Sequence, residues 1–203
     1  MMGICYIVGA GEFHSDFVPG DCDLVIAADG GYTHLLKRGI RCDLLVGDMD
    51  SIDSPPHGID VLRLPCEKDE TDTYVCYLEG VRRGYTDFVV FGGVGGRDDH
   101  TFANYSLLIG AIYENHRIKL VARDFDIFAV RNEKFGLNCR IGATLSIFAY
   151  PTEARGVSIK GAKYELDGAT LSPLFALGVS NEAICTSPTV EVTDGTLLIM
   201  LER

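Results

Sequence analysis

The 203-residue chain has no tryptophan, few basic side chains and no long apolar run. Its 18 Lys and Arg face 29 Asp and Glu, which gives a formal net charge of −11 at pH 7. Such an excess of negative charge opposes binding to nucleic-acid phosphates and to anionic lipid. No stretch approaches the roughly 20 apolar residues of a membrane-spanning helix, and the first residues lack the basic and apolar segments of a secretory signal. We therefore expect a cytoplasmic protein with neither nucleic acid nor membrane as a partner.

The cysteines show no pairing pattern. There are seven of them, scattered along the chain and never spaced Cys-x-x-Cys. An odd number without that spacing favours neither a zinc knuckle nor a framework of disulfides. Free cysteine is among the most commonly buried residue types, so we expect most of these thiols to be reduced core residues.

Apolar runs and helical patterns alternate in the first two thirds of the chain. Short runs rich in β-branched residues predict buried strands within 4–11, 23–31, 42–51, 60–65, 87–93 and 117–123. Between them, a helical period predicts helices over 32–38, 73–83 and 101–113. Strands that alternate with helices are typical of a mainly parallel sheet with helices on both faces. In the helix over 73–83, the expected buried face carries Tyr74, Val75, Leu78 and Val81.

The pattern changes near residue 132. From there on, strand-like runs are separated by Gly, Pro or Asn turns, and no helical period is present. The sequence therefore predicts an α/β fold: an N-terminal α/β domain with a mainly parallel sheet, residues 1–132, and a smaller C-terminal all-β sandwich domain, residues 133–203. A sandwich of about 70 residues is small to stand alone, so we expect it to lean on the first domain or on a second copy.

Acidic side chains follow several of the predicted strands. Asp29 ends one run, and Asp48 and Asp50 end the next, where a strand period of two places both carboxylates on one side. The segment 67–72 adds Lys68 and further acids before a predicted helix. Helix capping accounts well for Asp69 or Thr71. Helix capping accounts less well for acidic residues that follow several different strands. Such acids could instead bind a metal ion, and a set of oxygen ligands without His or Cys favours magnesium over zinc.

A glycine-rich segment, 92–100, follows another predicted strand. Its four glycines allow close approach of backbone N–H groups to phosphate oxygens. Arg97 adds a planar fork of donors, and His100 lies beside Arg97 and Asp99. The segment is not a P-loop, and Gly9-Ala10-Gly11 lacks the third glycine of the dinucleotide fingerprint. Since ligands bind beyond the carboxyl ends of strands in open parallel sheets, we expect these loops to form one site.

In order and spacing, the segments 29–31, 47–51, 67–73 and 92–104 resemble thiamine pyrophosphokinases. The segments 161–166 and 177–182 are similar to the C-terminal motifs of that family. The resemblance implies an α/β catalytic domain, a β-sandwich that binds thiamine, and a homodimer with active sites at the subunit interface. It also implies the reaction, in which the pyrophosphoryl group of ATP moves to the hydroxyl of thiamine, giving thiamine diphosphate and AMP.

The resemblance further assigns residues to roles. The implied Mg²⁺ ligands are Asp48, Asp50, Asp69 and Asp72. The implied catalytic residues are those four acids together with Arg97 and Asp99. The implied ATP contacts are Asp29, Gly30, Lys68, Thr71, Gly95, Gly96, Arg97, His100 and Asn104. The implied thiamine contacts are Ser180, Asn181 and Tyr164, the last standing near a position where many relatives carry a tryptophan.

Two other functions use the same loops. A non-catalytic nucleotide or thiamine sensor would bind the ligands without turnover, and a Mg²⁺-dependent phosphohydrolase would release phosphate without an acceptor. Neither needs a sandwich domain that carries Ser180 and Asn181. Asp72 is a candidate acceptor of the hydroxyl proton, although transfer of this kind depends mainly on positioning and charge neutralisation.

Overall fold

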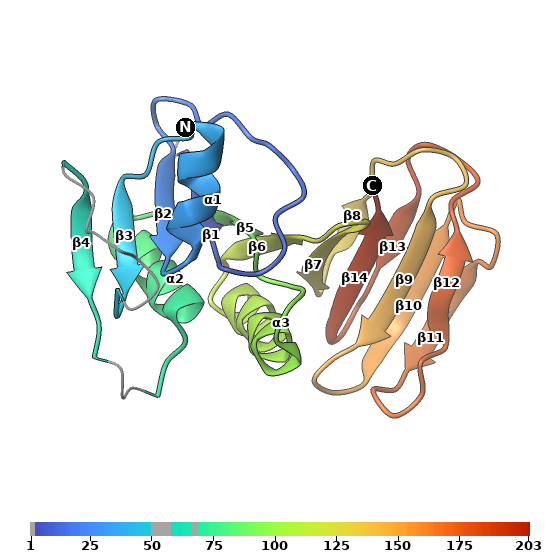
Figure 1. Ribbon diagram of the computed structural model, residues 1–203. Coiled ribbons are helices and arrows are strands. Elements are labelled where there is room, and N and C mark those ends of the chain that lie inside the picture. Colours follow the sequence, from blue (N-terminus) through green and yellow to red (C-terminus); the bar gives the residue numbers. More distant parts are fainter. Residues whose placement is uncertain (1–2, 50–57, 66–68) are drawn as a thin grey trace. The chain divides into compact units, whose positions relative to one another are not determined.

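The computed structural model describes residues 3–49, 58–65 and 69–203 (Figure 1). The chain divides into two compact units, which we call the N-terminal unit and the C-terminal unit. The N-terminal unit comprises Met1–Leu107 and Asn115–Arg123, and the C-terminal unit comprises Leu108–Glu114 and Asp124–Arg203.

The N-terminal unit contains a parallel sheet. Its strands are β1 (Cys5–Val8), β2 (Leu24–Ala28), β3 (Leu44–Gly47), β4 (Asp60–Arg63), β5 (Asp87–Phe91) and β6 (Arg117–Val121). Their order is β4-β3-β2-β1-β5-β6, and each neighbouring pair is parallel. The chain places β2, β3 and β4 on one side of β1, then returns to place β5 and β6 on the other. The strand order therefore reverses between β1 and β5, where open parallel sheets bind their ligands.

Two helices cover opposite faces of this sheet, α1 (Gly31–Arg38) and α2 (Asp72–Arg82) (Figure 1). On one face, Leu35 of α1 packs in a cluster with Val8 and Val25. On the other face, Gly80 of α2 lies so close that a Cβ there would be 2.9 Å from the sulfur of Cys5. The third helix, α3 (Asp98–Tyr113), begins directly after the glycine-rich segment. These positions confirm the predicted alternation of strands and helices.

The predicted buried face of α2 is wrong. Tyr74 and Leu78 are 39% and 43% exposed, whereas Cys76, Tyr77 and Gly80 are buried. The helix turns Cys76, Tyr77 and Gly80 toward the sheet, where a Cβ on Gly80 would collide with the ring of Phe88. The positions of the large apolar side chains therefore predicted a face of α2 next to the one that is buried.

The C-terminal unit is a β-sandwich. Its strands are β7 (Phe125–Arg131), β8 (Lys134–Gly136), β9 (Thr144–Ala149), β10 (Ala154–Lys160), β11 (Leu166–Leu171), β12 (Gly178–Glu182), β13 (Thr189–Glu191) and β14 (Thr196–Glu202). They form the antiparallel arrangements β12-β9-β14-β7 and β11-β10-β13-β8. Buried side chains from both arrangements, such as Ile147 and Ile199 from one and Ile159 and Val190 from the other, form one core. This confirms the predicted fold class.

Strand β7 is an element that the sequence pattern did not indicate. It pairs with β14 along its whole length, from Phe125 opposite Glu202 to Arg131 opposite Thr196. The C-terminal unit accordingly takes in the chain from Asp124 onward, one strand before residue 133. The segment 169–178 contains the end of β11, a connection through Pro173, and the start of β12.

The described cysteines are free thiols, as expected. Cys5 and Cys76 are buried, but Cys22 is exposed and the others are half-buried, so the expectation of core burial holds only for some of them. Burial raises the pKa of Cys5 to about 12 and that of Cys42 to about 11, so both thiols stay protonated at neutral pH. In the described part of the chain, no helix has the length and apolar character needed to cross a membrane.

Candidate active site

The loops that follow β1 and β5 interlock where the strand order reverses. The N–H of Gly9 donates to the carbonyl of Phe91 at 2.8 Å, and that of Gly11 to the carbonyl of Gly92 at 2.9 Å. A Cβ on Gly9 would be 2.6 Å from the Gly92 carbonyl oxygen, and Gly92 itself has a φ of 61°. Only glycine fits this approach and this conformation. The Gly9-Ala10-Gly11 segment, which fails as a dinucleotide fingerprint, thus has a role in shaping the candidate site.

The predicted phosphate-binding segment, residues 92–97, is anchored from α3. Asn104 is 5% exposed, and its side-chain N–H donates to the Gly93 carbonyl at 2.6 Å. Gly95 and Gly96 are exposed and have φ values of 77° and 94°. Of the predicted ATP contacts, Asn104 is therefore buried and holds the loop through a hydrogen bond, whereas Gly95 and Gly96 expose their backbone to solvent.

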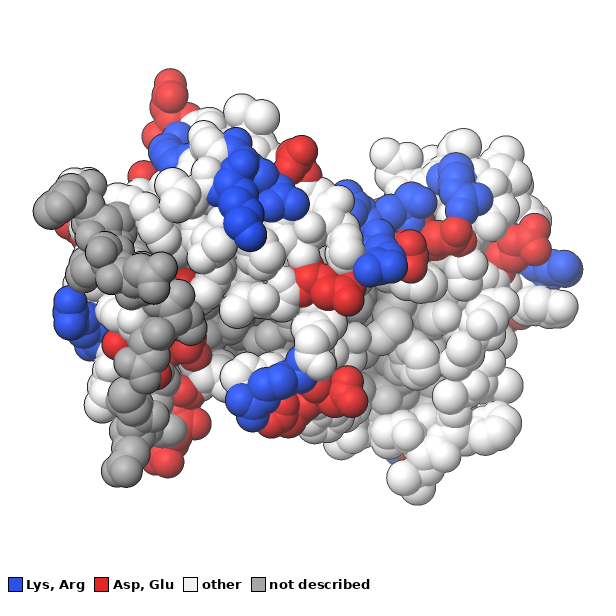
Figure 2. Space-filling model, viewed as in Figure 1, with Lys and Arg blue, Asp and Glu red and all other residues white. Residues whose placement is uncertain are grey.

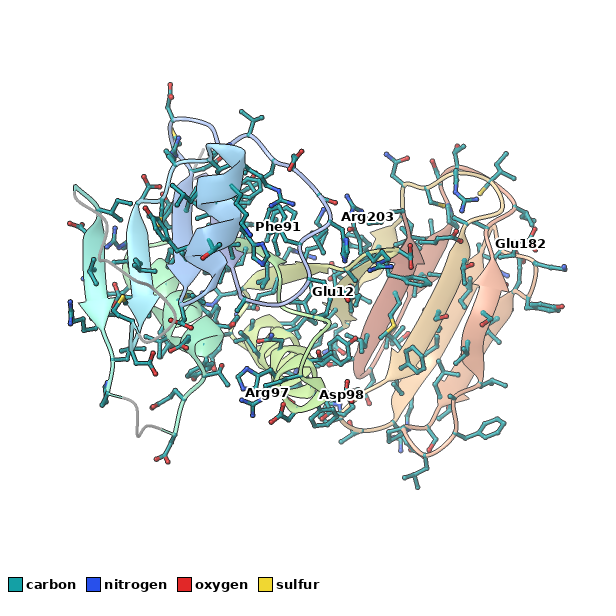
Figure 3. The ribbon with its side chains drawn as sticks, in the orientation of Figure 1. Glu12, Phe91, Arg97, Asp98, Glu182 and Arg203 are labelled. Carbon is teal, nitrogen blue, oxygen red and sulfur yellow. The ribbon has the colours of Figure 1, made fainter. Side chains whose placement is uncertain are left out.

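Arg97, Asp99 and His100 lie at the start of α3. The Arg97 guanidinium donates two hydrogen bonds to the Asp99 carboxylate, at 2.6 and 3.1 Å. The backbone N–H of His100 donates to the same carboxylate at 2.9 Å. The hydrogen bonds from Arg97 lower the pKa of Asp99 to about 2, so the carboxylate stays ionised at neutral pH. Asp99 thereby aligns the Arg97 guanidinium beside the exposed Gly95 and Gly96. Arg97 and Asp98 are labelled at one end of α3 in Figure 3.

Asp29 and Asp48 follow the neighbouring strands β2 and β3. The N–H of Asp29 donates to the Val46 carbonyl at 2.7 Å, and its φ of 44° is in the left-handed region. A Cβ on Gly47 would be 3.0 Å from the Cβ of Asp29, so glycine at 47 leaves room for that side chain. Asp48 is half-buried at the end of β3. The structure thus brings two of the predicted acids to adjacent strand ends, and Gly30 continues from Asp29 into α1.

The start of α2 carries the next group of predicted residues. Thr71 caps the helix, because its side-chain oxygen accepts a hydrogen bond from the N–H of Tyr74 at 3.2 Å. Asp72 lies in the first turn, and Asp69 is exposed before it. The capping interpretation therefore explains Thr71 fully, as the sequence allowed.

The predicted magnesium ligands include one residue that the structure does not place. Asp50 and Lys68 both lie outside the described residues. Among residues 3–49, 58–65 and 69–203, no three His, Cys, Asp or Glu side chains form a group that could hold a metal ion. The magnesium site therefore stays a prediction. Its proposed donors are carboxylate oxygens alone, a set that suits Mg²⁺.

In the C-terminal unit, the two segments predicted to meet thiamine lie side by side. The carboxamide oxygen of Asn181 accepts from the backbone N–H of Tyr164 at 3.0 Å and of Glu182 at 2.9 Å. The amide nitrogen of Asn181 donates to the Tyr164 carbonyl at 2.7 Å. Asn181 is only 6% exposed, so its side chain is used to join the two segments.

Ser180 and Tyr164 face outward instead. Ser180 has a φ of 58° at an irregularity in the pairing of β12 with β9, and its backbone N–H donates to the Ser146 hydroxyl at 3.0 Å. Its own side chain is exposed, and Tyr164 is 63% exposed. A left-handed non-glycine residue at a strand irregularity is a common feature of binding sites. Of the three predicted thiamine contacts, Ser180 and Tyr164 are therefore accessible to a ligand.

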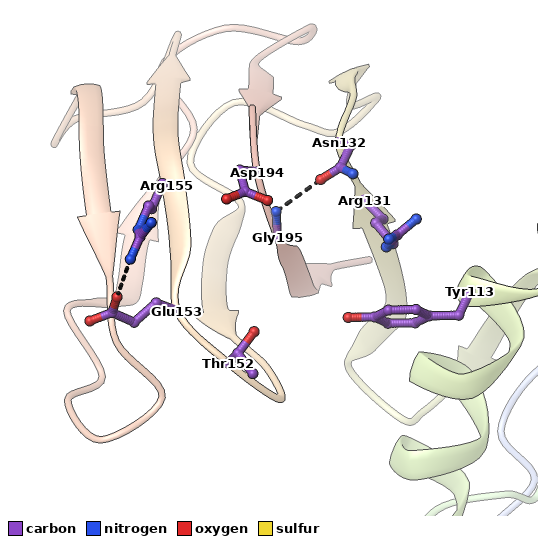
Figure 4. Close-up of a pocket in the computed structure, with 8 residues that line it drawn as sticks. All are labelled: Tyr113, Arg131, Asn132, Thr152, Glu153, Arg155, Asp194 and Gly195. Atoms are coloured by element: carbon purple, nitrogen blue, oxygen red, sulfur yellow. Dashed lines mark hydrogen bonds and ion pairs between the residues drawn. The ribbon is translucent and has the colours of Figure 1, made fainter.

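A polar pocket of about 370 Å³ also lies in the C-terminal unit, lined by residues that were not predicted (Figure 4). The guanidinium of Arg131 stacks 4.3 Å from the Tyr113 ring, and Arg155 pairs with Glu153 at 3.3 Å. The basic side chains of the lining are matched by acidic ones, including Asp194. Since neither sign of charge dominates, the pocket favours no class of charged ligand, and we assign it no function.

The comparison with known proteins covers both units. The description "Thiamin pyrophosphokinase, catalytic domain" matches residues 18–121, and "Thiamin pyrophosphokinase, vitamin B1 binding domain" matches residues 132–197. The chain belongs to the thiamin pyrophosphokinase family. The first match includes the interlocked β5 loop and the acids that follow β2 and β3, and the second includes Tyr164, Ser180 and Asn181.

Individual members of the thiamin pyrophosphokinase family resemble the chain over nearly its whole length. The thiamine pyrophosphokinase of Bacillus subtilis (strain 168) is 25% identical over 193 residues, which are 87% of this chain and 86% of the relative. A crystal structure from the same organism has a TM-score of 0.89 at 24% identity and covers 98% of each chain. A Geobacillus thermodenitrificans thiamin pyrophosphokinase has a TM-score of 0.85 at 26% identity and covers 98% of this chain and 97% of its own.

Proposed function

We propose that the chain is an enzyme that transfers the pyrophosphoryl group of ATP to the hydroxyl of thiamine, giving thiamine diphosphate and AMP. One observation carries this proposal. The loops after β1 and β5 interlock where the strand order reverses, and the family's catalytic-domain description covers the β5 loop there. This is the position at which an open parallel sheet binds a nucleotide.

The chain's own groups account for phosphate binding. The start of α3 directs backbone N–H groups and the positive end of the helix dipole toward the glycine segment. Arg97 adds a guanidinium that Asp99 holds in place at 2.6 Å. Asn104 fixes the carbonyl of Gly93 and so prevents the loop from relaxing away. These groups bind and orient the triphosphate, which is the main requirement of phosphoryl-type transfer.

Magnesium is the cofactor that the acidic residues would hold. Asp48, Asp50, Asp69 and Asp72 are its proposed ligands, with oxygen donors of the kind that Mg²⁺ prefers. When bound, Mg²⁺ supplies neutralisation of triphosphate charge and polarisation of the attacked phosphorus. Without it, the carboxylates of this chain would repel ATP.

Thiamine would bind to the C-terminal unit through the exposed groups of Ser180 and Tyr164. The thiazolium ring of thiamine carries a permanent positive charge, which favours contact with an aromatic face such as that of Tyr164. The net charge of −11 also attracts a cationic substrate over a modest range. Asn181 keeps both segments in register behind these groups.

A homodimer with active sites at the subunit interface is part of the proposal. Leu174, Phe175 and Leu177 are 94%, 69% and 54% exposed in the connection between β11 and β12. Figure 2 shows a broad uncharged area at the end of the C-terminal unit where this connection lies. Exposed apolar side chains grouped in this way favour contact with another protein surface. Free thiols and the acidic net charge support a cytoplasmic location without nucleic-acid or membrane partners.

Separation of the nucleotides after incubation with Mg-ATP and thiamine tests the reaction. We expect AMP and thiamine diphosphate in equal amounts. Formation of ADP would indicate an ordinary kinase, and release of phosphate or pyrophosphate without thiamine would indicate a phosphohydrolase. Intact ATP after long incubation with thiamine would favour a sensor.

The Asp48→Asn variant tests the acidic part of the site. Because Asp48 lies half-buried at the end of β3, loss of its charge should nearly abolish turnover and leave the fold intact. The circular-dichroism spectrum of the variant should match that of the wild type. Normal turnover in a folded Asp48→Asn protein would remove Asp48 from the site.

A further inference from the structure

Glu12 lies across the glycine segment at the candidate ATP site. Its backbone N–H donates to the Val94 carbonyl at 3.1 Å, which ties it to the β5 loop. A Cβ on Gly95 would be 2.6 Å from the Cγ of Glu12 and 2.9 Å from its carboxyl carbon. The Glu12 carboxylate therefore lies directly beside the exposed glycine of the proposed phosphate-binding segment. Glu12 is labelled in Figure 3.

Two basic side chains meet this carboxylate. His14 Nε2 is 2.7 Å from Glu12 Oε2, and a terminal nitrogen of Arg123 is 3.4 Å from the same oxygen. Arg123 is in the loop that follows β6, far from Glu12 in the sequence. The hydrogen bond from His14 and the charge of Arg123 lower the pKa of Glu12, so this carboxylate is ionised at neutral pH.

An ionised carboxylate at this position is unfavourable for a triphosphate, because like charges within a Debye length of about 10 Å repel each other. Arg123 offsets that charge, since a guanidinium is always protonated at neutral pH. At the pH of an ordinary assay, Arg123 is thus the permanent counter-charge.

We propose that Arg123 is a positioning residue for ATP binding, which acts through Glu12 by cancelling its charge and holding its side chain over Gly95. The inference rests on the proposed function of the glycine segment. Neither residue needs to touch ATP. The pair differs from Arg97 and Asp99, because it joins the end of β1 to the end of β6 across the β5 loop.

A double-mutant cycle tests the inference. Arg123→Ala should raise the KM for ATP about fivefold, as expected for an exposed pair, and leave the KM for thiamine and kcat unchanged. Glu12→Gln keeps a side chain of the same shape over Gly95 and removes the charge that Arg123 is proposed to cancel. In the double variant, Glu12→Gln should cancel most of the effect of Arg123→Ala. The fivefold effect should also shrink as salt is raised.

Arg155→Ala is the matched control. Arg155 is an exposed arginine paired with a glutamate at 3.3 Å, as Arg123 is at 3.4 Å, but it lies in the C-terminal unit. It should leave every kinetic parameter unchanged.

Several results would overturn the inference. An unchanged KM for ATP in Arg123→Ala would do so, and an equal rise in the Glu12→Gln background would show that Arg123 acts on phosphate directly. A parallel loss of thermal stability and of both substrate affinities would indicate a structural role. Calorimetric titration with Mg-ATP alone measures the same cycle without turnover. Failure of the transfer reaction would therefore be told apart from failure of the Glu12–Arg123 coupling.

Discussion

At the scale of single residues, Asn181 joins two segments that are well separated in the sequence. Its carboxamide makes hydrogen bonds with both the N–H and the carbonyl of Tyr164, and also accepts from the N–H of Glu182. A buried polar side chain with all its partners inside the protein stabilises the position of those partners. The exposed ring of Tyr164 and the exposed side chain of Ser180 therefore depend on Asn181 for their arrangement.

The Asn181→Ala variant should lower the free energy of unfolding by about 1 to 3 kcal/mol, because the backbone groups of Tyr164 and Glu182 lose the partner that the buried carboxamide provides. Urea unfolding measures this change. Tyr164→Ala is the control, since its ring is 63% exposed; its unfolding free energy should change by no more than about 0.5 kcal/mol. If Asn181 served only to contact thiamine, both variants would unfold like the wild type and differ only in the KM for thiamine.

The residue types of the candidate site could be predicted from the sequence, but their partners could not. Asp29, Asp48 and the glycine segment were placed correctly at strand ends, because β-branched runs closed by Gly or Asp mark those ends. Tyr164, which makes two hydrogen bonds with Asn181, lies 17 residues away in the sequence, and no local pattern encodes that contact. Glu12 was missed for the same reason, since its neighbours Gly95 and Arg123 meet it only in the folded chain.

At the scale of elements, the loops after β1 and β5 depend on glycine for contact. Gly92 has a φ of 61°, and a Cβ there would collide with the carbonyl of Gly9. Gly39, at the end of α1, has nearly the same φ of 63° but nothing within 4 Å of such a Cβ. The two glycines thus separate the effect of backbone conformation from the effect of close packing.

Gly39→Ala should lower the free energy of unfolding by about 1 kcal/mol, from left-handed strain alone. Gly92→Ala should lower it by about 3 kcal/mol or more, because the methyl group pushes the two loops apart. It should also raise the KM for ATP, whereas Gly39→Ala should not. Thermal unfolding and steady-state kinetics measure both effects. Equal destabilisation by the two variants would mean that the loops separate without cost.

The positions of helices and strands along the chain were easier to predict than the faces that they bury and the strands with which they pair. The strands and helices of the N-terminal unit lie where apolar runs and helical periods indicate, since burial on both faces of a sheet leaves a continuous signal. The buried face of α2 was predicted wrongly because it is formed by Cys76, Tyr77 and Gly80, which fit closely against the sheet. Strand β7 was overlooked, although it pairs with β14 along its whole length.

At the scale of the whole molecule, the proposed homodimer would cover the exposed apolar residues of the C-terminal unit. In a single chain of 22.1 kDa, Leu174 and Phe175 are 94% and 69% exposed to water. Apolar side chains at such exposure are costly unless another surface covers them. A sandwich that is small for an independent domain gains most from such cover.

The Phe175→Glu variant should dissociate the dimer, because it places a charge where apolar contact is proposed. Sedimentation should give twice the mass of one 22.1 kDa chain for the wild type and the mass of one chain for the variant. Val18→Glu is the control: Val18 is 91% exposed in the N-terminal unit and should leave the dimer intact. If the active sites lie at the subunit interface, the turnover of Phe175→Glu should fall in proportion to the loss of dimer. A fully active monomer would place the complete site within one chain, and a Phe175→Glu dimer would move the interface to another surface.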